Sequence, residues 1–96
     1  MSKEEIIDSI ISYLPKYGVI KAAIFGSFAK NTSNSESDID LLVDFEKGKS
    51  LFDLIGLKQD LEEKISKKID IVTFNSIHPH IKQSILNEMH VFYERS

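Results

Sequence analysis

The sequence contains no cysteine and no tryptophan, and it has only two prolines and four glycines in 96 residues. Without cysteine there are no disulfide bonds or thiolate metal ligands, which fits a reducing interior. Basic residues are not in excess, because 12 Lys and Arg stand against 15 Asp and Glu. No extended nucleic-acid surface is therefore expected. No apolar run is long enough to span a membrane, and the acidic start does not resemble a secretion signal, so we expect a cytoplasmic protein.

The length and the 42% hydrophobic content predict one domain, residues 1–96, with a single core. Ser2 and Glu5 have the spacing of a capping box and precede apolar residues at helical intervals, which predicts a helix over 2–14. Ser50 and Asp53 repeat this spacing before a second helix that ends near 65. Its apolar residues are predicted to face the core, and its interior Gly56 indicates close packing.

Mostly apolar runs predict three strands, at 19–25, 39–45 and 69–74. A short strand is predicted at 91–93, after a last helix that begins at Pro79. The fold class is therefore α/β, a small mixed β-sheet with helices packed on it. His78 and His80 flank Pro79 with a spacing that can bind metal, but their position favours a capping or solvent role.

Three aspartates lie in or beside strands that otherwise look buried. Asp38 and Asp40 would project from the same face with Cα atoms roughly 6 to 7 Å apart, within reach of one hard cation. Asp70 is the third acid. Unpaired charge is costly in such places, and although Lys21 or Lys30 could match one acid, three converging acids are better explained by a divalent metal.

A Gly-Ser pair ends the first predicted strand. Gly26 lets the backbone turn sharply and approach a ligand closely, and Ser27, at the start of a short predicted helical turn, offers donors to a phosphate. Residues 28–37 are rich in Ser and Asn and predict a loop after that turn. The loop is either a solvated connector or a flap that orders over a bound nucleotide.

The combined pattern resembles the minimal nucleotidyltransferases of the polymerase β superfamily. The motifs that carry the resemblance are Gly26-Ser27-x-Ala29-Lys30, Ser37-Asp38-Ile39-Asp40-Leu41-Leu42-Val43 and Ile69-Asp70-Ile71-Val72, and the likeness covers nearly the whole chain. It implies a polymerase β-like core. It also implies that Asp38 and Asp40 bind two Mg²⁺ ions, while Asp70 completes the metal site and helps to deprotonate the acceptor hydroxyl.

The same resemblance implies that Gly26 and Ser27 hold the phosphates of ATP, with Lys30 beside them. The family commonly has Arg and then Gly after Ala29, whereas this chain has Lys30 and Asn31. Lysine keeps the charge but loses bidentate geometry on phosphate, which affects nucleotide affinity or selectivity. Asn31 preserves the turn, because asparagine tolerates a left-handed backbone.

The activity implied by the resemblance is transfer of AMP from ATP to a hydroxyl, with pyrophosphate leaving. Similar proteins are often the antitoxins of HEPN-domain ribonuclease toxins, so the expected partner and acceptor is a tyrosine of a HEPN toxin. A homo- or hetero-oligomer is compatible with this role. Two alternatives stay open: a non-catalytic antitoxin that masks its partner, and a nucleotidyltransferase that acts on RNA ends or a small molecule.

Overall fold

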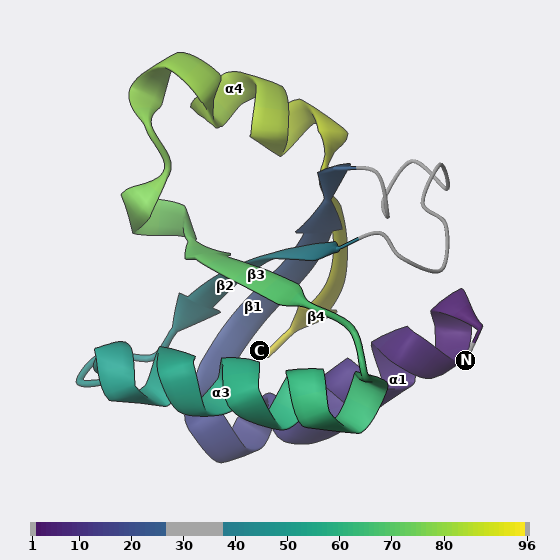
Figure 1. Cartoon of the computed structure of the whole chain (residues 1–96). Helices are drawn as coiled ribbons and strands as arrows, with labels where there is room; N and C mark the ends of the chain where they lie inside the picture. Colours follow the sequence, from purple (N-terminus) through teal and green to yellow (C-terminus); the bar gives the residue numbers. More distant parts are fainter. Residues whose placement is uncertain (1, 27–37, 96) are drawn as a thin grey trace.

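The computed structural model describes residues 2–26 and 38–95. Its centre is a four-stranded sheet in the order β3-β2-β1-β4 (Figure 1). β1 runs antiparallel to β2 and β4, whereas β2 and β3 are parallel, so the sheet is mixed as predicted. The elements are α1 (Lys3–Tyr13), η1 (Pro15–Tyr17), β1 (Val19–Phe25), β2 (Ile39–Phe45), α3 (Leu51–Ile65), β3 (Ile69–Thr73), η2 (Phe74–Ser76), α4 (Pro79–Glu88) and β4 (His90–Glu94).

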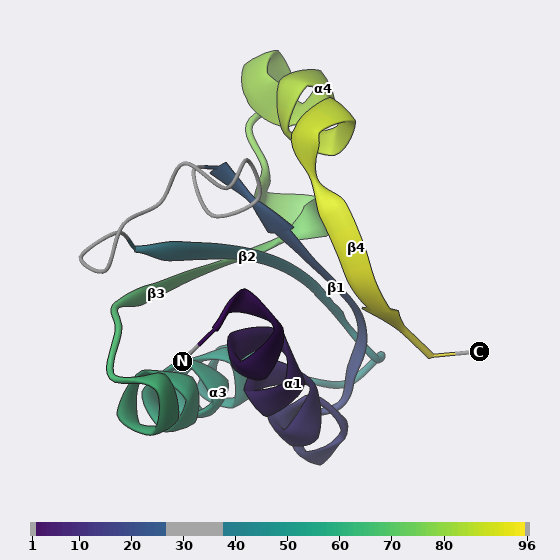
Figure 2. The same cartoon turned by 90° about the vertical axis from the view of Figure 1, so that its right-hand side faces the viewer.

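Helices α1 and α3 cover one face of the sheet, and α4 lies on the other side (Figure 2). The α1–α3 side holds the main core, built from fully buried residues of these helices and of the strands. On β2, Ile39, Leu41 and Val43 belong to this core. Strand side chains alternate between faces, so Asp40 and Leu42 project to the α4 side. Leu42 packs there in a smaller cluster with Ala23 and Ile77.

The predicted helix starts are confirmed. Ser2 and Glu5 form a capping box before α1, and Ser50 and Asp53 form another before α3. His78 caps α4, because its Nδ1 atom accepts a hydrogen bond of 3.2 Å from the backbone N–H of His80. No helix within the described ranges is both long and apolar enough to cross a membrane.

Two predictions about the elements are corrected. The strand predicted to reach residue 74 ends at Thr73, and a 3₁₀ turn begins at Phe74. The apolar face predicted for α3 is buried only from Leu57 onward, because the helix extends beyond β1 and β2 at its beginning (Figure 1). Leu51 and Ile55 are 68% and 41% exposed there, and Phe52 is 85% exposed. A Cβ atom on Gly56 would lie 2.9 Å from the ring of Tyr17, which confirms the predicted close packing.

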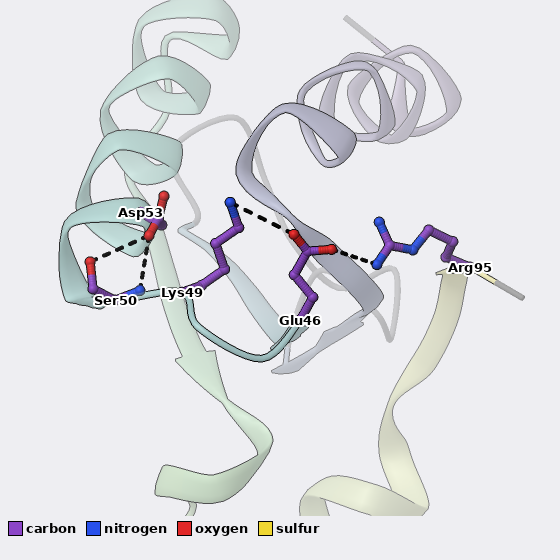
Figure 3. A network of polar contacts seen from close by, with 5 residues as sticks. All are labelled: Glu46, Lys49, Ser50, Asp53 and Arg95. Atoms are coloured by element: carbon purple, nitrogen blue, oxygen red, sulfur yellow. Dashed lines mark hydrogen bonds and ion pairs between the residues drawn. The ribbon is translucent and has the colours of Figure 1, made fainter.

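An exposed polar network joins the end of the chain to the β2–α3 connection (Figure 3). Arg95 donates a 2.7 Å hydrogen bond from its guanidinium group to Oε2 of Glu46, and Lys49 lies 3.7 Å from Oε1 of the same carboxylate. The bond from Arg95 holds the pKa of Glu46 below its ordinary value. Asp53 accepts a 2.9 Å bond from the backbone N–H of Ser50 beside this network. The contacts of Glu46 tie the residue after β4 to the β2–α3 connection.

Candidate active site

Asp40 and Asp70 are register partners on the parallel strands β2 and β3. Register partners on adjacent strands project to the same face, and such strands lie about 4.8 Å apart. The two carboxylates are therefore neighbours on the α4 side of the sheet. Phe25, on β1, is the partner of Asp40 on its other side. The structure thus brings together two acids that are thirty positions apart in the sequence, as predicted.

Asp38 lies just before β2 and is exposed. The pKa of Asp40 is raised, first by burial and then by the negative charges of Asp70 and Asp38. Both effects disfavour the ionised form of Asp40. Asp38 and Asp70 are therefore both close enough to Asp40 to repel its negative charge.

Gly26 directly follows β1 and contacts the Asp40 side chain. Its φ of +73° is in the left-handed region, and an added Cβ atom would lie 2.5 Å from Oδ2 of Asp40. Both the backbone conformation and the space therefore require glycine. The sequence predicted that this glycine allows close approach of a ligand, and the group that approaches it in the structure is the Asp40 carboxylate.

The other half of the predicted phosphate site lies outside the described residues. Ser27 and Lys30 belong to this part of the chain, as do the substituted Asn31, the helical turn and the predicted loop over 28–37. Their roles in binding phosphate stay predictions.

Within the part of the chain that the structure describes, the sequence analysis missed a lysine that lies beside one of the acids. The Nζ atom of Lys58, on α3, lies 3.9 Å from Oδ1 of Asp70. Lys21, which the sequence suggested as a partner for one of the acids, instead lies 3.9 Å from Glu94 and 5.3 Å from the ring centroid of Phe74. The sequence feature that could have indicated Lys58 is its position on the helix that directly precedes the strand of Asp70.

The chemistry of these acids fits a magnesium ion. Carboxylate oxygens are the ligands that Mg²⁺ prefers, and a cation would offset both the burial and the repulsion that raise the pKa of Asp40. Within residues 2–26 and 38–95, however, no three His, Cys, Asp or Glu side chains are arranged closely enough to hold a metal ion. The donor set therefore suits the metal, while a complete ligand shell is not assembled by these side chains alone.

Comparison with known proteins places this arrangement in a family. The protein family described as "Polymerase beta, Nucleotidyltransferase" matches residues 8–96 of this chain. The chain belongs to this nucleotidyltransferase family. A candidate protein adenylyltransferase of Methanocaldococcus jannaschii is 53% identical over 88 residues, which cover 92% of this chain and 95% of that protein. Protein adenylyltransferase MntA of Thermococcus cleftensis is 33% identical over 90 residues, covering 88% of this chain and 91% of MntA.

Solved structures show the same fold. A candidate minimal nucleotidyltransferase, 31% identical, superposes with a TM-score of 0.82 and covers 94% of this chain and 95% of its own. A structure from a complex of a tri-AMPylated Shewanella oneidensis HEPN toxin with an MNT antitoxin has a TM-score of 0.75 at 18% identity, covering 97% of this chain and 73% of its own. At that identity the likeness concerns the fold alone. The predicted polymerase β-like core is confirmed.

Proposed function

We propose that this protein transfers AMP from ATP to a hydroxyl group on a partner protein, with Mg²⁺ held by the carboxylates of Asp38, Asp40 and Asp70 together with the phosphates of ATP. The observation that carries the proposal is the register of Asp40 opposite Asp70, with Gly26 against the Asp40 carboxylate. It is supported by membership of a nucleotidyltransferase family and by the likeness to protein adenylyltransferase MntA.

Each residue has a distinct task in the proposed reaction. When bound, Mg²⁺ supplies positive charge that stabilises the incoming and departing oxygens of an in-line displacement. Asp38 and Asp40 hold the metal. Asp70 helps to hold it and accepts the proton of the acceptor hydroxyl, whose oxygen forms a bond to the α-phosphorus of ATP. The bond from that phosphorus to pyrophosphate breaks, while Gly26 and Ser27 bind the phosphates.

The proposed acceptor is a tyrosine of a HEPN-domain toxin, which makes this protein an antitoxin. The structural match to an MNT antitoxin bound to a tri-AMPylated HEPN toxin motivates this choice. The acceptor is then presented by the second protein chain.

The test is an incubation of the protein with α-labelled ATP, Mg²⁺ and a HEPN-domain toxin. The expected result is label on a toxin tyrosine, which is absent with Asp40→Asn and with EDTA. Asp44→Asn, which changes a β2 acid outside the proposed set, is the matched control and should keep the activity. Toxin silencing without label that survives Asp38→Asn and Asp40→Asn would identify a masking module. Label on RNA ends or a small molecule would identify another acceptor.

A further inference from the structure

The outer edge of β3 is held by two side chains of α3 at the residue just before Asp70. Among residues 2–26 and 38–95, β3 is at the edge of the sheet and has a neighbouring strand on one side only. On that inner side, the carbonyl of Lys68 accepts a 3.0 Å bond from the N–H of Ile39. Backbone groups alternate in direction along a strand, so the N–H and C=O of Ile69 point outward. They need partners from elsewhere.

Both outward groups of Ile69 find their partners on α3. The N–H of Ile69 donates to Oε2 of Glu62 at 2.9 Å, and Nζ of Lys58 donates to the carbonyl oxygen of Ile69 at 2.9 Å. Glu62 and Lys58 are one helical turn apart, and their charged atoms lie 3.7 Å from each other. Together the Glu62 and Lys58 side chains form a clamp that holds both backbone groups of one residue, Ile69, in the edge strand.

The lysine of this clamp also reaches the proposed active site. Its Nζ atom lies 3.9 Å from Oδ1 of Asp70, so one ammonium group contacts the backbone before Asp70 and the Asp70 carboxylate. The Lys58 and Glu62 side chains are 33% and 31% exposed, so packing limits their freedom. A charged donor with three hydrogens suits these several oxygen partners.

We propose that Lys58 and Glu62 are positioning residues that fix Asp70 opposite Asp40 by clamping the start of β3 from its outer edge. This inference rests on the proposed function, in which Asp70 holds metal and accepts a proton. An Asp70 displaced by about 1 Å would slow transfer by up to roughly 10²-fold. Binding of ATP would change little, because its phosphates are bound at the end of β1. The clamp therefore acts on kcat rather than on KM for ATP.

The first measurement is steady-state AMP transfer by Lys58→Met, which keeps the length of the side chain and removes its charge. We expect kcat to fall about tenfold or more, with KM for ATP within about threefold of wild type. Lys58→Arg, which retains a cationic donor, should recover most of kcat. Lys64→Met removes an exposed lysine from the same helix and serves as the matched control with unchanged kcat.

The second measurement needs no activity. In the metal-free protein, amide hydrogen exchange at Ile69 should accelerate about tenfold in Glu62→Leu, which removes the acceptor, and much less in Glu62→Gln, which keeps one. Exchange in the α1–α3 core should stay unchanged in both, which shows that the variants are folded.

The two measurements separate failure of the clamp from failure of the proposed function. If wild-type protein labels no acceptor, the proposed function fails, and Ile69 exchange still tests the clamp. Lys58→Met with wild-type kcat would overturn the positioning role, as would a rise in KM that accounts for the whole loss. Unchanged Ile69 exchange in Glu62→Leu would overturn the clamp itself.

Discussion

Gly26 lies against Asp40 so closely that a methyl group on its Cα would stand 2.5 Å from the Asp40 Oδ2 atom. The relationship links the end of β1 to the beginning of β2, which are also hydrogen-bonded neighbours in the sheet. The glycine therefore sets where the Asp40 carboxylate can lie. The same residue begins the segment proposed to bind phosphate, so one position connects the two halves of the site.

Replacing Gly26 with alanine should abolish AMP transfer and destabilise the fold. The left-handed backbone at Gly26 costs an L-residue roughly 1 to 2 kcal/mol, and the methyl group would also displace the Asp40 carboxylate. Urea unfolding and the labelling assay measure the two effects. Gly48→Ala is the matched control, because Gly48 also has a positive φ, of +95°, but open space around it. It should lose stability and keep its activity, and full activity in Gly26→Ala would contradict the role given to this contact.

Asp40→Asn should stabilise the metal-free protein at pH 7. The folded pKa of Asp40 is raised above the ordinary value of 3.8. The carboxylate therefore lowers the free energy of unfolding as pH rises through the folded pKa. Asparagine removes this charge, so the gain in stability should vanish as pH falls towards 3.8. Urea unfolding at several pH values measures this difference.

The same unfolding experiment with added Mg²⁺ tests the metal. Mg²⁺ should stabilise the wild type, because a ligand that binds only the folded state raises its stability, and should do so far less in Asp40→Asn.

For the metal-free experiment, Asp53→Asn is a control of opposite sign, since the backbone N–H of Ser50 lowers the pKa of Asp53. It should be destabilised at neutral pH. A less stable Asp40→Asn at pH 7 would show that repulsion among the acids is not significant.

Local signals predicted most of the fold because they depend on neighbouring residues. The first two strands, 19–25 and 39–45, were predicted with their observed bounds, and both capping boxes form. Asp40 and Asp70 were identified as candidate metal ligands because both residues interrupt apolar runs. The clamp made by Lys58 and Glu62 could not be predicted, because it depends on how α3 lies against the edge of β3. The exposure of the first residues of α3 could not be predicted either. Helical periodicity shows which face of the helix is apolar, but not where the strands that cover this face end.

The burial gradient along α3 predicts different costs for one substitution at two positions. Leu61 is fully buried in the main core, whereas Leu51 is 68% exposed. Leu61→Ala should lower the free energy of unfolding by about 2 to 5 kcal/mol. Leu51→Ala should change it by less than about 0.5 kcal/mol. Urea unfolding compares the two variants, and equal losses would contradict the described placement of α3.

Tyr17→Phe should destabilise the protein only within a defined range of pH. The Tyr17 hydroxyl donates a hydrogen bond to Oδ2 of Asp60, which joins η1 to α3 and raises the pKa of Tyr17 to about 12. The same bond lowers the pKa of Asp60 below its ordinary value of 3.8. A raised folded pKa means that the stabilisation is complete below the ordinary tyrosine value of 10.0 and is lost as pH rises through about 12.

For Asp60 the sign is reversed, because a lowered folded pKa gives stabilisation above 3.8 that is lost as the pH falls through the folded value. Wild type should therefore exceed Tyr17→Phe in urea unfolding at pH 7, and the difference should shrink at pH extremes on both sides. A double-mutant cycle with Asp60→Asn isolates the bond, since the phenylalanine variant should cost less when the carboxylate is already absent. An equal deficit of Tyr17→Phe at all pH values would show that the hydrogen bond between the Tyr17 hydroxyl and the Asp60 carboxylate is not its cause.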